Sequence, residues 1–332
     1  MPVIKKSEYK NPPFYLFNAH LETIVPSMFF KVPDDLYERE RLELGDGDFL
    51  DLDWIKNNKS RCVVITHGLE GGSERYYVKR TAKFFRDRGW DVMAWNCRSC
   101  SGEMNRLPRF YHHGDTEDLS TVIDRVMEEG YESVALVGYS MGGSMSLKYL
   151  GEQSRASKIK GGVFFSVPCD LRDSAIQLLK KENRLYEQRF LKKLVEKIRI
   201  KAEAHPGVVS SEGLDSLRDF DTFHDRYTAP LHGFQSKDDF FASATCDQYL
   251  PGISVPVLIV NAQNDPMLGT ACSPYDIAHQ SDFVYLETPK KGGHVGFTLP
   301  RNAHSYIEKR AEAFIHEQLR ISPSVENSEI QS

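Results

Sequence analysis

One short segment of the sequence combines a nucleophilic hydroxyl with the glycines that a sharp backbone turn requires. Residues 138–142 read Gly-Tyr-Ser-Met-Gly, with Ser140 at the centre; an apolar run precedes them and a helical pattern follows. This order of strand, serine and helix is typical of a nucleophile elbow, in which glycines avoid Cβ clashes and the first N–H groups of the helix face developing negative charge. Ser140 is therefore the predicted nucleophile.

An aspartate and a histidine later in the chain are suited to activate this serine. A serine hydroxyl is a weak nucleophile until a base removes its proton, and the acid and then the histidine follow such an elbow in the sequence. Asp265 follows an expected strand over 257–261, and His294 follows one over 283–287. Both should lie at the edge where open parallel sheets bind their ligands. We predict His294 as the base and Asp265 as the acid that orients it.

Asp170 is an alternative acid, because it follows the next strand after the serine. It also precedes the helix expected from Leu171, where an aspartate commonly caps the first turn. Asp265 is preferred because its order in the chain and its place after a strand both agree with the elbow. The other candidate histidines either precede Ser140 or lie in helical or charged surroundings: His20, His67, His112, His113, His279, His304 and His316.

The negatively charged oxygen that forms during acyl transfer needs two backbone donors. One is expected from the N–H of Met141, directly after the nucleophile. The other is expected from Leu69 in the segment 66–73, which follows a strand and reads Thr-His-Gly-Leu-Glu-Gly-Gly-Ser. The alternative is an ordinary turn that needs these glycines for its own geometry. We predict that Leu69 and Met141 form the oxyanion hole.

Other chemistries lack the residues that they need. No phosphate-binding glycine motif follows a strand. Cys97 and Cys100 have the spacing of a redox or zinc pair, but no second pair completes four ligands. His112 and His113 are adjacent, a spacing that rarely serves one metal, and Asp115 is expected to cap the helix that follows. We therefore predict neither a cofactor nor a metal.

Short apolar runs alternate with helical patterns, which predicts a mostly parallel sheet flanked by helices. The eight expected strands cover residues 39–44, 49–55, 62–66, 91–95, 133–137, 162–167, 257–261 and 283–287. The first two are joined by Gly-Asp-Gly-Asp and should form an antiparallel hairpin. The expected helices outside the longest gap between strands cover residues 75–88, 115–129, 141–152 and 303–319.

That longest gap, about 85 residues before the strand at 257–261, contains no convincing strand. A structureless loop of this length does not suit a compact domain, so we expect a helical cap with an apolar underside beside Ser140. A helical stretch over 184–204 carries apolar residues at near-helical spacing: Leu185, Leu191, Leu194, Val195 and Ile198. The expected division is a core over 1–168 and 253–320, a cap inserted at 169–252 and a flexible tail at 321–332.

The bulk composition indicates no nucleic-acid partner. Lys and Arg number 42 against 47 Asp and Glu, a net charge of −5, whereas a nucleic-acid footprint needs a clustered basic excess. The N-terminal residues form no continuous apolar stretch, and no run approaches the ~20 apolar residues of a bilayer span. We expect a cytoplasmic protein without a transmembrane segment, for which transient contact with a membrane surface stays open and the oligomeric state is not predicted.

Together these motifs resemble the YheT-like branch of the α/β-hydrolases over nearly the whole chain, from about residue 11 to residue 319. The resemblance rests on segments at 18–24, 46–50, 53–54, 67–71, 98–103, 111–119, 138–143, 228–230, 264–266 and 293–294. It implies the α/β-hydrolase fold, with a mostly parallel eight-stranded sheet, flanking helices and an inserted helical cap. Residues 96–98 read Asn-Cys-Arg where relatives tend to have an Arg-Gly pair, so we assign this loop no catalytic role.

From the serine nucleophile and the apolar cap we expect an acyl-serine intermediate, with a small apolar ester of short to medium acyl chain as the partner. The resemblance also implies hydrolysis of carboxylic esters, without identifying the substrate. It carries the roles of nucleophile, acid and base onto Ser140, Asp265 and His294. An acyltransferase that uses the same residues to form esters is an alternative. A non-catalytic binding module of the same fold is another, although such proteins usually lose one of the three residues. Animal relatives often carry an N-terminal membrane span, which we do not expect here.

Overall fold

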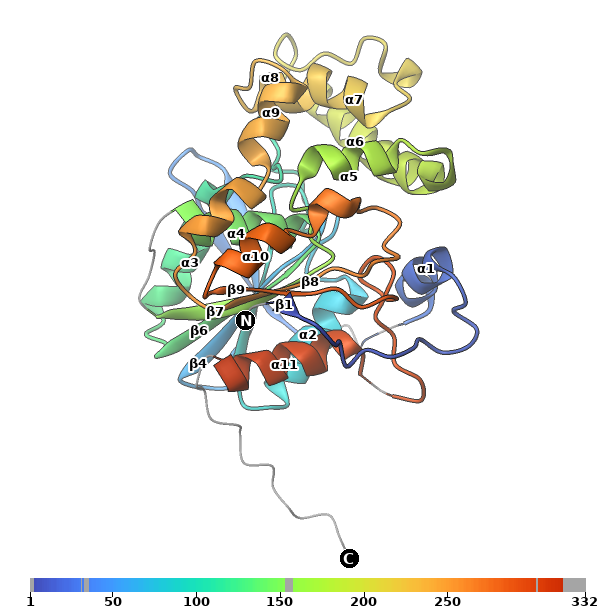
Figure 1. The fold of residues 1–332 in the computed structure, drawn as a ribbon. Coiled ribbons are helices and arrows are strands. Elements are labelled where there is room, and N and C mark those ends of the chain that lie inside the picture. Colours follow the sequence, from blue (N-terminus) through green and yellow to red (C-terminus); the bar gives the residue numbers. More distant parts are fainter. Residues whose placement is uncertain (1–2, 31, 33–35, 153–157, 303, 319–332) are drawn as a thin grey trace, which may run out of the picture.

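Figure 1 shows the computed structural model of the chain, which describes residues 3–30, 32, 36–152, 158–302 and 304–318. A twisted sheet lies at the centre and helices cover both of its faces. A further group of helices lies above the sheet in this view. The flexible tail predicted at 321–332 lies outside the described residues.

The sheet has nine strands in the order β1-β9-β8-β7-β6-β4-β5-β3-β2. They are β1 (Val3–Ile4), β2 (Glu38–Glu43), β3 (Phe49–Ile55), β4 (Arg61–Thr66), β5 (Asp91–Asn96), β6 (Ser133–Tyr139), β7 (Ile159–Phe165), β8 (Val257–Val260) and β9 (Val284–Glu287). β3 runs antiparallel to β2 and β5, and the remaining neighbours are parallel. The mostly parallel sheet and its antiparallel hairpin are thus confirmed.

The predicted number of eight strands is wrong by one. The additional strand, β1, pairs in parallel with β9 at the edge of the sheet. It has only two residues. A segment this short cannot show the alternation of apolar and polar residues that reveals a strand, so the sequence offers no periodic signal for it.

The helices outside the segment between β7 and β8 are α1 (Ala19–Phe29), α2 (Tyr76–Arg86), α3 (Thr116–Glu128), α4 (Met141–Glu152), α10 (Tyr275–Gln280) and α11 (Tyr306–Gln318). The structure places α2, α3, α4 and α11 where helices were predicted. Helices α1 and α10 were not predicted; α10 has only six residues, and Pro26 interrupts the pattern of α1, because proline lacks the N–H of a regular helix. Asn18, whose side chain accepts a hydrogen bond from the Leu21 N–H, caps the start of α1 and was the available signal.

Successive residues of the central strands belong to two different cores. Val63 and Ile65 of β4 lie in one buried cluster with side chains of α2 and α11. Val64, between them, lies in a second cluster with side chains of α3 and α4. Because both faces are covered, β4 is apolar at consecutive positions. The sheet is thereby a rigid base for the loops that follow β4, β6 and β8.

Residues 166–256, all of which the structure describes, contain helices and turns but no strand. The helices are α5 (Leu171–Leu178), α6 (Arg184–Ala204), α7 (Phe220–Phe223), α8 (Ala229–Leu231) and α9 (Lys237–Ala244). In Figure 1, α5 to α9 form the group above the sheet. The inserted helical cap is therefore present, and α6 has its predicted bounds. The division of the chain at residues 169 and 252 stays a proposal.

The apolar stripe of α6 is buried only in part. Leu191, Leu194 and Ile198 are buried, whereas Leu185 is 73% exposed. Leu185 lies in the first turn of the helix and does not share the burial of the rest of the stripe.

A buried charge cluster joins the hairpin to α3. The Arg98 guanidinium donates to both carboxylate oxygens of Asp118 at 2.7 Å and to Asp48 at 2.8 Å. It also pairs with Asp46 at 2.8 Å. The side chains of Arg98, Asp48 and Asp118 are at most 5% exposed, so their ion pairs are shielded from water, whereas Asp46 is 36% exposed. The loop that the sequence left without a catalytic role thus has a structural one.

Two aspartates at helix starts differ from each other in their capping. Asp170 accepts a hydrogen bond from the Asp173 N–H, so its interpretation as an N-cap is confirmed. Asp115 occupies the N-cap position of α3 but makes no capping hydrogen bond. Its carboxylate lies 3.4 Å from the Arg109 guanidinium instead, so the predicted cap is wrong. Burial, followed by repulsion from Asp118, raises the pKa of Asp115 to about 7.

We predict that Arg98→Met destabilises the fold by about 3–5 kcal/mol, because removing one partner leaves buried carboxylates without a countercharge. Arg199→Met is the control, since Arg199 is 42% exposed and its pairs with Glu196 and Asp215 should contribute at most about 1 kcal/mol. Urea unfolding followed by circular dichroism measures both. Equal urea midpoints for Arg98→Met and Arg199→Met would show that the Arg98 ion pairs do not stabilise the contact between the β2–β3 hairpin and α3.

Candidate active site

Ser140 lies at the turn between β6 and α4, where the backbone adopts a positive φ of 51°. Such a φ is unfavourable for a residue with a side chain and persists only where the surroundings impose it. The Ser140 N–H donates to the Phe165 carbonyl at 2.9 Å. A Cβ atom on Gly142 would lie 2.4 Å from the carbonyl oxygens of Thr66 and His67. Only glycine allows this close approach of α4 to the end of β4.

The structure brings three predicted site residues into one hydrogen-bonded chain. His294 Nε2 lies 3.0 Å from Ser140 Oγ. His294 Nδ1 lies 2.8 Å and 3.1 Å from the two carboxylate oxygens of Asp265. Since the ionised carboxylate can only accept, Nδ1 carries the proton and leaves Nε2 free to accept from the serine hydroxyl. The rival acid, Asp170, is engaged as the cap of α5.

Asp265 is held in a buried turn after β8. Its N–H donates to the Ala262 carbonyl at 3.0 Å, and its Oδ1 accepts a hydrogen bond from the Met267 N–H at 2.9 Å. The Asp265 side chain is fully shielded from solvent, while that of His294 is 11% exposed. The imidazole therefore stands between a buried carboxylate and an accessible hydroxyl.

Helix α1 holds the two loops that carry Asp265 and His294. Glu22 Oε2 accepts from the Gly292 N–H at 2.6 Å, and Glu22 Oε1 accepts from Asn264 Nδ2 at 3.1 Å. Thr23 Oγ1 accepts from the His294 N–H at 2.9 Å. Burial raises the pKa of Glu22. Sequence reasoning did not assign these roles to Glu22 and Thr23, although both lie in the segment at 18–24 that carried the family resemblance.

The segment after β4 lies against the serine. A Cβ atom on Gly68 would lie 3.3 Å from the Ser140 Cβ. Among the described residues, no acceptor for the N–H of Leu69 or of Met141 is present in the backbone hydrogen bonds. Met141 follows Ser140 in the chain and Leu69 follows Gly68, and the oxyanion hole formed by their N–H groups stays a prediction.

The buried ring of His67 stabilises the segment that follows β4 through contacts of both its nitrogens. Its Nδ1 lies 2.7 Å from the Gly68 carbonyl oxygen, and its Nε2 accepts from the Cys97 N–H at 3.1 Å. Burial lowers the pKa of His67 to about 4, so the ring is neutral at pH 7 and can donate at one nitrogen while it accepts at the other. His67 therefore positions the backbone of the Leu69 segment.

A cavity of about 530 Å³ opens over Ser140, and we call it the serine cavity. Its walls come from α1, the start of α2 and α6, with Met28, Tyr77 and Phe190 among its apolar residues and Arg75 and Arg189 among its charged ones. Both Ser140 and His294 line it, as does Leu69. A ligand in this cavity can therefore reach the hydrogen-bonded chain.

The structure shows no alternative centre for metal chemistry within its described ranges. No group of three or more His, Cys, Asp or Glu side chains in those ranges could hold a metal ion. Cys97 and Cys100 are both free thiols. No helix among the described residues is long and apolar enough to cross a membrane.

The nine-stranded sheet and the serine at the strand-to-helix turn define the class of the α/β-hydrolases. The family model described as serine aminopeptidase, S33, matches residues 57–280. The putative esterase YheT of Escherichia coli is 34% identical over 288 residues, which cover 84% of each chain. The chain thus belongs to the YheT-like branch of the α/β-hydrolases.

More distant proteins agree with this assignment. Human phospholipase ABHD3 is 28% identical over 335 residues, covering 95% of this chain and 80% of that protein. The structure of the Pyrococcus furiosus esterase Pf2001 matches with a TM-score of 0.57 at 16% identity, covering 87% of this chain and 97% of that chain. At this sequence identity, the match to the Pf2001 structure shows a shared fold alone. The relatives that carry an activity in their names include esterases and lipases, so the chain is a hydrolase of esterase type.

We predict that Thr23→Val lowers kcat for a p-nitrophenyl ester by about 10–100-fold, because the His294 N–H loses its acceptor and the imidazole shifts. Thr121→Val is the matched control: like Thr23, Thr121 donates to the carbonyl four residues earlier, but it lies on the exposed face of α3. Steady-state kinetics measure both. Equal kcat values for the two variants would contradict the positioning role of α1.

Proposed function

We propose that the protein is a serine carboxylic-ester hydrolase in which Ser140, His294 and Asp265 form the catalytic triad. The observation that carries the proposal is the chain of hydrogen bonds from Asp265 through His294 to the Ser140 hydroxyl. The positive φ of Ser140 and the accessible cavity above it support the same role.

In the proposed reaction, Ser140 Oγ attacks the carbonyl carbon of the ester while His294 Nε2 takes its proton. Asp265 stabilises the resulting imidazolium through Nδ1. The N–H groups of Leu69 and Met141 donate to the oxyanion of the tetrahedral intermediate. The imidazolium then protonates the departing alcohol, which leaves an acyl-serine. Water, activated by the same imidazole, hydrolyses this intermediate and restores the free serine.

The substrate class follows from the relatives and from the cavity. Similar proteins are named as an esterase, a phospholipase and a monoacylglycerol lipase, and we propose a carboxylic-ester bond as the group that this chain cleaves. The serine cavity offers apolar side chains beside this bond. We infer apolar esters of short to medium acyl chain as substrates. Transfer of the acyl group to an alcohol would use the same residues, and product analysis with added alcohol separates the two outcomes.

The first prediction from this proposal is a dependence on acyl length that requires Ser140. Each CH₂ buried in an apolar site contributes about 0.8 kcal/mol, so kcat/KM for p-nitrophenyl esters should rise from acetate to a medium-chain optimum. Ser140→Ala should reduce turnover of every ester by at least about 10³-fold, because the nucleophile is gone.

Circular dichroism serves as the control that Ser140→Ala is folded. Wild-type-like turnover in a folded Ser140→Ala protein would exclude the proposed nucleophile. A series that falls steadily from acetate upward would exclude medium-chain esters as the substrate class.

A second prediction separates the two candidate acids. Asp265→Asn should lower kcat by about 10³–10⁴-fold, because an amide no longer holds the imidazole in the required tautomer or stabilises its cation. Asp170→Asn is the matched substitution and should leave kcat within about twofold, since asparagine also caps helices well. The reverse order of effects, measured by steady-state kinetics, would place the acid after β7.

A further inference from the structure

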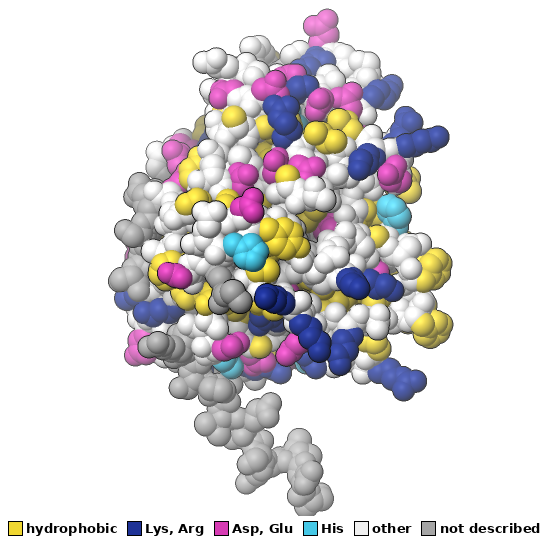
Figure 2. Space-filling model, viewed as in Figure 1, with side chains coloured by type: hydrophobic (Ala, Val, Ile, Leu, Met, Phe, Trp, Pro, Cys, Tyr) yellow, Lys and Arg dark blue, Asp and Glu magenta, His cyan; other side chains and the backbone are white. Residues whose placement is uncertain are grey.

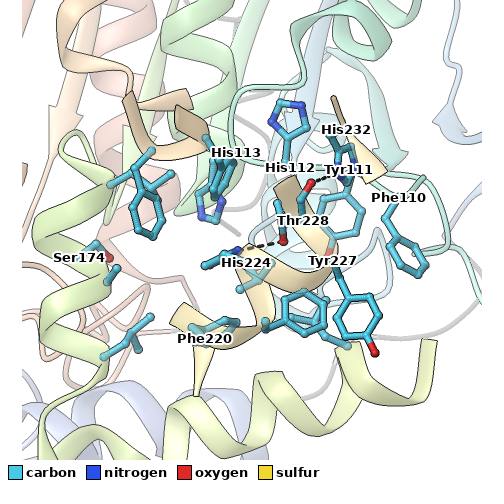
Figure 3. Close-up of a pocket in the computed structure, with 18 residues that line it drawn as sticks. Phe110, Tyr111, His112, His113, Ser174, Phe220, His224, Tyr227, Thr228 and His232 are labelled. Atoms are coloured by element: carbon cyan, nitrogen blue, oxygen red, sulfur yellow. Dashed lines mark hydrogen bonds between the residues drawn. The ribbon is translucent and has the colours of Figure 1, made fainter. Parts of the chain in front are cut away.

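A second cavity, which we call the cap chamber, lies between the cap and the loop that follows β5. It has a volume of about 70 Å³ and is lined by Leu69, by α5, α7 and α9, and by the π-helical turn η3 (His224–Thr228). In Figure 3 the side chains of Ser174, Phe220 and His224 surround the open space, with His113 beside it. None of the proposed triad residues lines it, so the mechanism above does not use it.

Apolar and aromatic side chains dominate the walls of the cap chamber. Leu171, Ala175 and Leu178 line it from α5, and Phe240 and Phe241 line it from α9. Two hydroxyl groups that also reach it have partners: Ser174 Oγ donates to the Met267 carbonyl at 2.9 Å, and Thr228 Oγ1 lies 2.9 Å from His224 Nδ1. The chamber therefore offers mainly carbon surface to a ligand.

Four histidines in these walls do not make the chamber charged. Burial lowers the pKa of His113 to about 4, that of His224 to about 3 and that of His232 to about 4. The pKa of His112 is also well below its ordinary value for the same reason. The rings of His112 and His224 pack against Phe240 with centroids 5.8 Å and 5.1 Å away. At pH 7 these histidines are neutral, and the Nδ1 atoms of His224 and His232 are hydrogen-bonded to Thr228.

One shared residue and one hydrogen bond connect the linings of the cap chamber and the serine cavity. Leu69, which follows the glycine in contact with Ser140, lines both cavities. Ser174 of the cap chamber is hydrogen-bonded to Met267, which lines the serine cavity. Leu69 is therefore the shared lining residue that an acyl chain bound at Ser140 would have to pass to reach the cap chamber.

The two cavities differ in the chemistry that they suit. The serine cavity carries charged side chains, including Arg75, Arg189 and Glu74, and suits the more polar alcohol portion of an ester. The cap chamber suits an alkyl chain. One bound water occupies about 10–15 Å³ of cavity volume, so the 70 Å³ of the cap chamber would hold about five waters. A short stretch of methylene groups takes a similar space.

We infer that the cap chamber binds the distal methylene groups of the substrate's acyl chain, with Leu69 at its entrance and α5 as the wall that sets the accepted length. This assignment rests on the proposed function, because an acyl chain arrives there only from an ester at Ser140. The helix concerned differs from the one expected from the sequence: α5 contributes four of the 18 lining residues, whereas α6 contributes Leu194.

The test compares p-nitrophenyl octanoate with p-nitrophenyl acetate, which share one leaving group and differ only in acyl length. Ala175→Phe places a bulky ring in the cap chamber and should lower the octanoate-to-acetate ratio of kcat/KM at least about tenfold, as loss of several buried CH₂ groups requires. Ile176→Phe is the matched control on the same helix. Ile176 is 53% exposed and outside the chamber lining, so this variant should keep the wild-type ratio.

Leu178→Ala provides a second variant with the opposite effect. It enlarges the chamber and should move the acyl length with the highest kcat/KM toward longer chains. This variant tests the inference if circular dichroism shows that Ala175→Phe does not fold.

The outcomes separate the inference from the proposed function. Wild-type protein that hydrolyses neither ester overturns the proposed function and this inference with it. Wild-type protein that hydrolyses both esters, with an unchanged ratio in Ala175→Phe and an unchanged optimum in Leu178→Ala, overturns the inference alone. A lower ratio in Ala175→Phe and a longer optimum in Leu178→Ala, with the wild-type ratio in Ile176→Phe, supports it.

Discussion

The carbonyl oxygens of Thr66 and His67 lie so close to Gly142 that no side chain fits between them. This approach brings the start of α4 against the end of β4 and fixes two features at once. Ser140 is held at its positive φ on one side, and the Leu69 segment is held beside it on the other. His67, buried and neutral, ties that segment to the loop after β5. The nucleophile and the proposed oxyanion donors thus depend on one backbone contact.

The positions of His294 and Asp265 depend on a different part of the chain, the helix α1. Their loops follow β8 and β9, and both are held by side chains of α1 that lie between 242 and 271 positions earlier in the sequence. Hydrogen bonds from Gly292 and His294 to Glu22 and Thr23 complete this tie. An imidazole on a loop would otherwise lose orientation easily, and a displacement of about 1 Å can cost 10²-fold in rate. The N-terminal helix is therefore part of the architecture of the site.

Much of this arrangement could be predicted from the sequence because the signals were local. The elbow at Ser140 needs glycines at fixed offsets, and β4 and β6 are apolar enough to be recognised as buried strands. Features that depend on distant partners could not be predicted. The short β1 forms by pairing with β9, and the loops of Asp265 and His294 are held by Glu22 and Thr23. Likewise, the side chains that line the cap chamber come from helices too short, or too irregular around η3, to show a period.

The most direct measurement of the central claim is labelling with a fluorophosphonate probe, followed by mass mapping of the modified peptide. A serine activated by the His294–Asp265 pair should react stoichiometrically, with the adduct on Ser140. Labelling should disappear in Ser140→Ala and fall strongly when His294 is replaced by alanine. Folded wild-type protein that takes up no probe, or carries it on a different serine, would contradict the account.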